Sequence, residues 1–212
     1  EDRKLKLTNP HYIDRLLQRF RLEEAAIAKT PLIVSANSQP TSKEPFSNQA
    51  LYQEAVGALI WTSITWRWDI STAVGLVARN VSAPTNSDWN NVKRILRYLK
   101  GTRDFCIEYS SRDIDPVGLR TYTDADYAAG SDRKSTSGLL VLWNGQPVHW
   151  RSCKQTCVAL STTEAEYIAA ATAYKETLWL RQILADLLRH QPAYVLPPTP
   201  FHVDNHRATA LA

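Results

Sequence analysis

Three acidic residues lie where the sequence pattern predicts that a strand or a helix begins or ends. Asp124 ends an alternating stretch over residues 119–123, Glu166 falls in the first turn of a long helical stretch, and Asp204 follows the short run 200–203. Three carboxylates that converge without Lys or Arg partners repel one another, and a divalent cation with oxygen ligands relieves that repulsion. Mg²⁺ takes few protein carboxylates and completes its coordination with water and phosphate oxygens. These residue types therefore point to metal-dependent hydrolysis of a phosphodiester.

The elements predicted around these acids would bring them to one edge of a sheet. Three short strands come first, then a long helix, then a fourth strand, over residues 119–123, 138–143, 147–152, 163–189 and 200–203. Asn144-Gly145 is a strong type I′ hairpin signal between the second and third strands, and a further helix is predicted from Ala208. This order, β-β-β-α-β-(α), fits an α/β sheet whose fourth strand lies parallel beside the first. The ends of those two strands would place Asp124 beside Asp204, with Glu166 at the same edge.

Each acid also has an ordinary structural role open to it. Thr163 and Glu166 have the spacing of a capping box, so Glu166 could accept a backbone N–H at the start of the helix. Glu164 could interact with the helix dipole, Asp204 could cap the last helix, and Asp124 could belong to a turn. Any one acid taken alone favours such a role, whereas all three at matching element ends favour a shared site.

The first part of the chain carries the basic charge and a helical pattern. The net charge is +4, and residues 1–113 hold the whole excess, with 16 Lys and Arg against 12 Asp and Glu. The pattern predicts helices over 10–28, 51–79 and 86–100, a loop over 35–49 and a strand over 105–109. A basic region beside a neutral one suggests contact with a polyanion.

The predicted helix over residues 86–100 is the densest basic segment. Its apolar residues recur at helical spacing, while Lys93, Arg97 and Lys100 fall on another face at i, i+4 and i+7. Gly101 has the position of a residue that stops a helix. The basic face suits nucleic-acid binding, and the solvated face of an ordinary amphipathic helix is the alternative.

Composition excludes several classes of protein. Hydrophobic residues make up 44% of the chain and charged residues 22%, which argues against wholesale disorder. No apolar run approaches the roughly 18 residues that a membrane span needs. Cys106, Cys153 and Cys157 supply neither a closed disulfide framework nor a complete zinc ligand set, so we expect reduced thiols in an intracellular protein. The sequence has no methionine, even at position 1, so we expect a processed product or an internal fragment.

Several stretches resemble one known family. In the second part these are YTDADYAAGSDRKSTSG, KQTCVALSTTEAEYIAAATAYKETLWLRQIL and HVDNHRA. They resemble the ribonuclease H domain of copia-type LTR retrotransposon polyproteins. In the first part, HYIDRLLQRF, YQEAVGALIWTSITWRWDIS and WNNVKRILRYLKGTRDFCIEY are similar to the segment after the polymerase palm, through the thumb and connection. The resemblance implies a mainly helical thumb/connection-like region over 1–113 and an α/β, ribonuclease H-like domain with a mixed sheet over 114–212.

The resemblance also implies an activity and its metal ligands. Such domains cleave the RNA strand of an RNA–DNA hybrid with two Mg²⁺ (or Mn²⁺) ions. Carried over by motif, Asp124, Glu166 and Asp204 look like the catalytic metal ligands, and Glu166 matches the helix ligand better than Glu164 does. The implied partners are an RNA–DNA hybrid and the rest of the reverse transcriptase polyprotein, in cytoplasmic virus-like particles or the nucleus.

Further residues are expected to contact the nucleic acid. Ser161, Thr162 and Thr163 precede the long helix, where hydroxyl and N–H groups suit phosphate or 2′-OH contacts. Arg133 and Lys134 lie on the connection between the first two strands and are expected to touch phosphate, with a solvated turn as the alternative.

The sequence also departs from the family pattern. The family's fourth carboxylate, fifth strand and last helix lie beyond the position of Asp204, and the sequence given ends at Ala212, so we expect weak or no activity from this chain alone. Residues 64–69, ITWRWD, stand where the family usually has Thr-Arg-Pro-Asp.

Two other functions remain open at this point. The chain could be a decayed or domesticated module that binds nucleic acid or protein without turnover. It could also be an enzyme of another class that uses the same acids. Ser/His/Asp chemistry is not supported, because no Gly-x-Ser-x-Gly elbow accompanies the five histidines.

Overall fold

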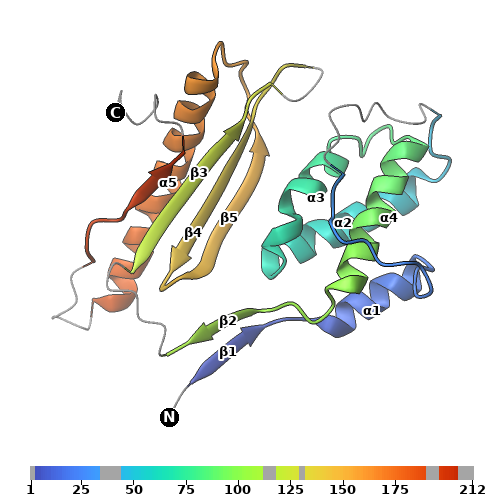
Figure 1. Cartoon of the computed structure of the whole chain (residues 1–212), viewed down its shortest axis with the longest axis horizontal. Coiled ribbons are helices and arrows are strands. Elements are labelled where there is room, and N and C mark those ends of the chain that lie inside the picture. The colour runs from blue at the N-terminus through green and yellow to red at the C-terminus, as the bar shows by residue number, and fades with distance from the viewer. Residues whose placement is uncertain (1–2, 34–43, 112–117, 129–131, 190–195, 205–212) are drawn as a thin grey trace. The chain divides into compact units, whose positions relative to one another are not determined.

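The computed structural model describes residues 3–33, 44–111, 118–128, 132–189 and 196–204. The chain divides into two units, one formed by Lys6–Ile107 and the other by Glu1–Leu5 together with Glu108–Ala212. The first unit is helical, and the second is a four-stranded mixed sheet packed against a long helix (Figure 1). The predicted mixed α/β architecture is therefore confirmed at this level.

The helical unit has one core. Its elements are α1 (Pro10–Arg19), α2 (Gln49–Thr65), the short 3-10 helix η1 (Trp68–Ile70), α3 (Ser71–Ala78) and α4 (Asn86–Gly101). All four α-helices contribute side chains that are almost fully buried in it, among them Ile13, Tyr52, Leu59, Val74, Ile95 and Leu99. The predicted helix over 10–28 is shorter than expected, because the chain turns after α1 and Arg21 has a φ of 54°.

The stretch over 51–79, which is predicted to be largely helical, is divided into separate helices in the structure. The break falls at Trp66 and Arg67, between α2 and η1. Arg67 is 1% exposed, and its guanidinium donates to both carboxylate oxygens of Asp69 at 2.9 and 2.7 Å and to the backbone and side-chain oxygens of Thr102. Burying this cation requires several acceptors at once, and the break supplies Asp69 two residues later.

The basic helix α4 begins at Asn86, as predicted, but extends one residue further than predicted. Thr85 caps its start in a full capping box with Asp88. The helix continues through Gly101 to a cap at Thr102, so the predicted stop at Gly101 is wrong. A Cβ on Gly101 would lie 3.3 Å from the Cβ of Ile27, so this glycine allows close packing instead.

A two-stranded sheet joins sequence-distant segments. It pairs β1 (Lys4–Leu7) with β2 (Ile107–Ser110). The pattern predicts a strand near β2, but it does not predict β1, whose four residues are all exposed. Residues 34–43, which include most of the predicted loop, and the helix predicted from Ala208 lie outside the described residues.

The four-stranded sheet has the order β5-β4-β3-β6. Its strands are β3 (Leu119–Asp126), β4 (Thr136–Trp143), β5 (Gln146–Lys154) and β6 (Phe201–Val203). The first three are antiparallel neighbours, and β6 runs parallel to β3, so the predicted pairing of the fourth strand with the first is confirmed. Asn144 and Gly145 have φ values of 49° and 79°, as a type I′ hairpin requires.

One helix covers a face of this sheet. It is α5 (Thr162–Leu188), and it packs on β3 and β4 (Figure 1). Its small residue Ala173 joins Leu119 and Val141 in the core of the unit. The hydroxyls of Thr121 and Thr177 share a buried hydrogen bond of 2.7 Å between the sheet and the helix. These contacts hold the middle of α5 against β3 and β4.

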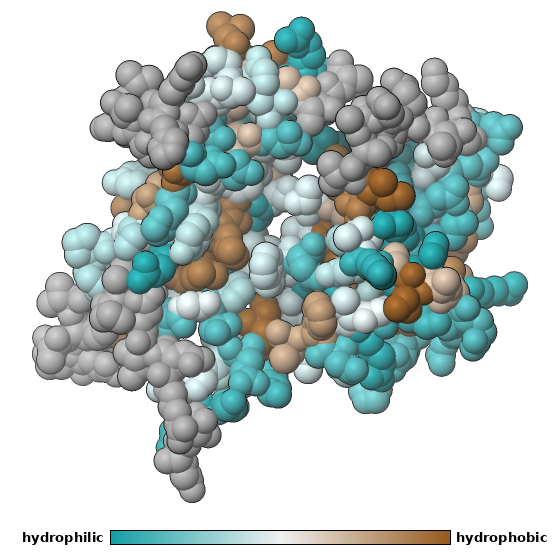
Figure 2. All heavy atoms as spheres, viewed as in Figure 1, coloured by the Kyte–Doolittle hydropathy of each residue, from teal (hydrophilic) through white to brown (hydrophobic). Residues whose placement is uncertain are grey.

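On the face shown in Figure 2, hydrophilic residues predominate and hydrophobic ones form small separate groups. No helix in the part of the chain that the structure describes is long and apolar enough to cross a membrane.

Candidate metal centre

The structure brings the three predicted acids together. One carboxylate oxygen from each of Asp124, Glu166 and Asp204 lies within 4.8 Å of the corresponding oxygen of the other two. The three residues come from β3, from the first turn of α5 and from the residue after β6. Asp124 lies two residues inside β3 rather than at its end, because the strand continues to Asp126.

The register of the parallel strands explains the approach of the two aspartates. Thr123 in β3 pairs with Val203 in β6. An aspartate follows each of these two residues in the sequence, so Asp124 and Asp204 lie at the same level along the two neighbouring strands. Both are exposed, which leaves their carboxylates open to solvent or ligand.

Glu166 differs from the two aspartates in its surroundings. Its side chain is 5% exposed, and its Oε2 atom is buried without a hydrogen-bond partner among the described residues. Burial raises the pKa of this carboxyl, the nearby carboxylates of Asp124 and Asp204 raise it further, and a hydrogen bond from the backbone of Ala125 partly offsets the rise. A buried unpaired carboxylate oxygen is costly, and a cation at this position would satisfy it.

The hydrogen bonds at the start of α5 show which of the two glutamates there, Glu164 or Glu166, is available to bind a cation. Ser161 is the N-cap residue, and its Oγ accepts a hydrogen bond of 3.1 Å from the backbone N–H of Glu164. The Oε2 atom of Glu164 in turn accepts a 2.6 Å hydrogen bond from the backbone N–H of Leu160. Glu164 therefore completes the cap, and the alternative capping box of Thr163 with Glu166 is wrong.

The other residues predicted to contact nucleic acid at this end of the sheet lie on the β3–β4 connection and at the start of α5. Arg133 and Lys134 are in the β3–β4 connection, next to Asp132, which forms an ion pair with Lys154 at the end of β5. The β3–β4 connection and the segment from β5 to α5 both lie at the end of the sheet where β3 finishes, which is the end that carries Asp124 (Figure 1). Arg133 is exposed, and Lys134 is half-buried.

The hydroxyl residues at the start of α5 differ in how free they are. Ser161 is committed to the helix cap, Thr162 is exposed and Thr163 is half-buried. Contact of these residues with a nucleic acid stays a prediction.

The basic face of α4 has a structural task that its pattern did not indicate. The Arg97 guanidinium donates to the backbone oxygen of Ala26, and the Lys100 ammonium donates to the backbone oxygens of Glu23 and Ala25. These cations hold the segment after α1 against α4. Lys93 lies on the same helix and is half-buried. Nucleic-acid binding by Lys93, Arg97 and Lys100 stays a prediction.

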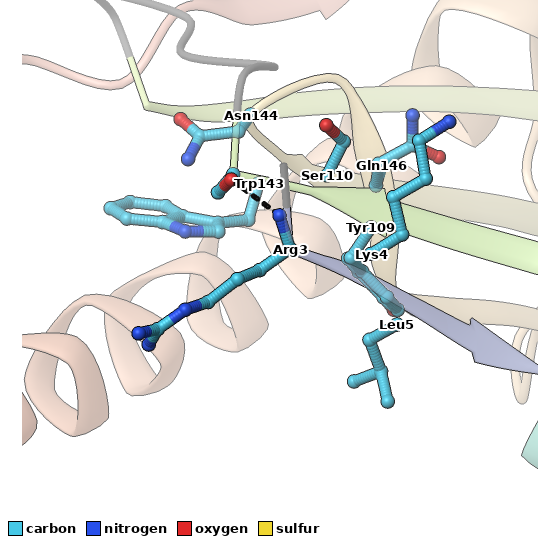
Figure 3. A pocket seen from close by; sticks show the side chains of 9 residues that line it. Arg3, Lys4, Leu5, Tyr109, Ser110, Trp143, Asn144 and Gln146 are labelled. Carbon is cyan, nitrogen blue, oxygen red and sulfur yellow. Dashed lines mark hydrogen bonds between the residues drawn. The ribbon is translucent and has the colours of Figure 1, made fainter. Parts of the chain in front are cut away.

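The second unit also has a shallow pocket, which lies away from the acids. It has a volume of about 310 Å³, and its lining includes Arg3, Lys4, Tyr109, Trp143 and Asn144 (Figure 3). Trp143 pairs with the first residue of β3, whereas the carboxylates gather near the last. The pocket therefore lies at the opposite end of the sheet and shares no residue with the acidic cluster.

Comparison with known proteins places the chain in a family. It is 44% identical over 201 residues to the retrovirus-related Pol polyprotein from transposon TNT 1-94 of Nicotiana tabacum. The aligned stretch covers 92% of this chain but only 15% of that polyprotein. The chain is a homologue of copia-type retrotransposon Pol polyproteins. This Pol homologue is also 34% identical over 211 residues to the Pol polyprotein from transposon RE2 of Arabidopsis thaliana, of which it spans 14%.

A shorter relative spans less of this Pol homologue. The secreted RxLR effector protein 161 of Plasmopara viticola is 42% identical over 130 residues, which is 61% of this chain and 90% of that protein. No family model and no solved structure matches the chain.

Proposed function

We propose that the second unit of this Pol homologue forms a ribonuclease H-type site, which holds Mg²⁺ or Mn²⁺ and cleaves the RNA strand of an RNA–DNA hybrid. The single observation that carries the proposal is the convergence of Asp124, Glu166 and Asp204 from three separate elements. The mixed sheet supports it, because the ribonuclease H resemblance implies such a sheet, and its parallel β3–β6 pair is the one that the sequence pattern predicts. The proposed partners are such a hybrid and the remainder of a Pol polyprotein.

The residues present fit a hard divalent cation. All three donors are carboxylate oxygens, which Mg²⁺ and Mn²⁺ prefer, and the buried Oε2 of Glu166 needs a partner. When bound, such ions activate water and stabilise the leaving oxygen of a phosphodiester. The chain's own part is to hold the three carboxylates at ligand distance and to orient the hybrid. Arg133 and Lys134 would attract its phosphates, and Thr162 could contact a 2′-hydroxyl.

Metal binding by the full chain is the primary test of the proposal. Asp124→Asn keeps the shape of the side chain but removes its charge, so we expect Mn²⁺ affinity measured by calorimetry to fall by at least about tenfold. Asp126→Asn is the matched control, because Asp126 is an exposed aspartate of the same strand outside the cluster. Equal Mn²⁺ affinity of the Asp124 variant and the wild type would contradict the proposal.

Cleavage of a labelled hybrid is the second test. We expect the RNA strand to be cut only when Mg²⁺ or Mn²⁺ is present, at a low rate, and not by the Asp124→Asn variant. The same sequence as duplex DNA should stay intact. Cutting that persists in EDTA would point to another enzyme class or to a contaminant.

A non-catalytic nucleic-acid-binding module is the second candidate. The observation that favours it is the position of Arg133 and Lys134 at the same end of the sheet as the acids. Hybrid binding that persists in the Asp124→Asn, Glu166→Gln double variant would support it. That binding should then weaken with salt, since phosphate contacts release counterions.

A further inference from the structure

Gln155 makes an unusual set of buried contacts just after β5. Its side chain is 5% exposed. The Nε2 atom donates to the Oγ of Ser137 in β4 and to the backbone oxygen of Ala165 in α5, both at 2.9 Å. The backbone N–H of Gln155 donates to the backbone oxygen of Ser135 at 2.8 Å. A single residue thus ties the start of β4 to the first turn of α5.

Both ends of this link are next to a carboxylate of the candidate metal centre. Ala165 immediately precedes Glu166 in α5. Ser137 pairs across the hairpin with Ala125, which immediately follows Asp124 in β3. The backbone of Ala125 also forms a hydrogen bond with the Glu166 carboxyl. The contacts of Gln155 therefore link β4, which pairs with the strand β3 that carries Asp124, to the turn of α5 that carries Glu166.

The chemistry of the amide explains why glutamine is needed at this position. A backbone carbonyl can only accept, so the side-chain nitrogen of Gln155 must face Ala165. This orientation leaves the Oε1 atom buried without a partner among the described residues. A buried unpaired acceptor costs stability, whereas an aliphatic side chain here would avoid that cost and lose both donated bonds. Gln155 therefore connects β4 to α5 at the cost of one buried oxygen without a partner among the described residues.

We propose that Gln155 is a positioning residue, which fixes the first turn of α5 on the β3–β4 hairpin so that Glu166 reaches Asp124 and Asp204. This inference rests on the proposed metal site. Hydrogen bonds behind metal ligands typically change metal affinity by about 10- to 100-fold when they are removed. Gln155 touches no ligand atom itself, so its effect would be transmitted through the backbone of Ala165 and through Ser137.

The test compares Gln155→Leu with Gln182→Leu in the full chain. Gln182 is an exposed glutamine of α5 and serves as the matched control. We expect Gln155→Leu to weaken Mn²⁺ binding by at least about tenfold and to speed amide hydrogen exchange in the first turn of α5. Exchange in the last turns of α5 should not change. The control should match the wild type in both measurements.

A second variant guards against general misfolding. Gln155→Met keeps the length of the side chain but has no hydrogen-bond donor for the Ala165 oxygen or the Ser137 hydroxyl, so we expect the same two effects. Wild-type Mn²⁺ affinity and wild-type exchange in either folded variant would overturn the positioning role. If the wild type binds no Mn²⁺, the proposed function fails, and the exchange of the first turn alone decides the role of Gln155.

Discussion

Glu166 is the residue at which folding and the proposed metal binding would make opposite demands. Its carboxyl is buried beside two other carboxylates, and its pKa is raised above the ordinary value of 4.5 for these two reasons. Between the ordinary and the raised pKa, the folded chain binds more protons than the unfolded chain. The free energy of unfolding therefore falls as pH rises through that window, and it stays lower above it.

Replacing this carboxyl should stabilise the metal-free chain at neutral pH. We expect Glu166→Gln to raise the free energy of unfolding at pH 7 by about 1 kcal/mol, the usual scale for relieving a strained functional position. At pH 4 the gain should largely vanish, because the wild-type carboxyl is then protonated. Urea unfolding in EDTA at the two pH values measures the difference.

Glu164→Gln is the matched control for this prediction. That variant keeps an oxygen that can accept from the Leu160 amide, but it loses the negative charge that strengthens this bond at the helix start, so it should be destabilised at pH 7. A Glu166→Gln variant that is less stable than the wild type at pH 7 would contradict the conflict described for Glu166.

The sequence indicates the acids but not every residue that supports them. Asp124 and Asp204 are predictable because each lies near the carboxyl end of a short strand, and neighbouring parallel strands end at one edge of a sheet. The tasks of Arg97 and Lys100 are not, because their carbonyl acceptors belong to a segment far away in the sequence. The helical spacing of cations shows which face they share, but not what that face contacts.

At the scale of elements, β6 depends on an arginine from α5. The Nη1 atom of Arg181 donates to the backbone oxygen of Pro197 and to the Oγ1 of Thr199, both at 2.7 Å, and Nη2 donates to the Leu196 oxygen at 3.3 Å. These bonds hold the chain that leads into β6, a strand of three residues whose register pairs it with β3. We therefore expect the position of Asp204 to depend on Arg181.

Removing this arginine should affect both stability and the metal site. We expect Arg181→Leu to cost about 1–3 kcal/mol, because several part-buried acceptors lose a donor, and to weaken Mn²⁺ binding. Arg189→Leu, which replaces an exposed arginine just after the same helix, should change stability by less than about 0.5 kcal/mol. Thermal unfolding and Mn²⁺ titration of both variants test this. Unchanged metal affinity in Arg181→Leu would show that β6 holds its place without Arg181.

Local signals predict most elements of the second unit. The alternation in β3 and the Asn144-Gly145 turn act over a few residues, so the sequence shows them directly. The break at Arg67 is harder to predict, because the acceptors for the guanidinium include the distant Thr102. The strand β1 escapes prediction because it buries none of its residues.

At the scale of the whole molecule, each of the two units has its own core. One core is built by the helices of Lys6–Ile107, and the other lies between the four-stranded sheet and α5. A ligand that binds only the folded form of one unit stabilises that unit by mass action, by about 2.7 kcal/mol at 100 times its dissociation constant.

We therefore expect Mn²⁺ to protect one unit selectively. Hydrogen exchange read out along the chain during urea unfolding should show later unfolding of β3, α5 and β6 when Mn²⁺ is present. Helices α1 to α4 should unfold at the same urea concentration with and without the metal. The same shift in both units, or its persistence in the Asp124→Asn variant, would count against a metal site confined to the second unit.

The pairing of β3 with β6 also sets the stage of synthesis at which the three carboxylates can come together. Asp124 is made early in the second unit, but Asp204 follows only after the hairpin, all of α5 and the connector to β6. A ribosome must release this entire stretch before the third carboxylate can join the other two. The proposed metal site would therefore form only after β6 has been made, and a nascent chain that lacks β6 would have no complete carboxylate cluster.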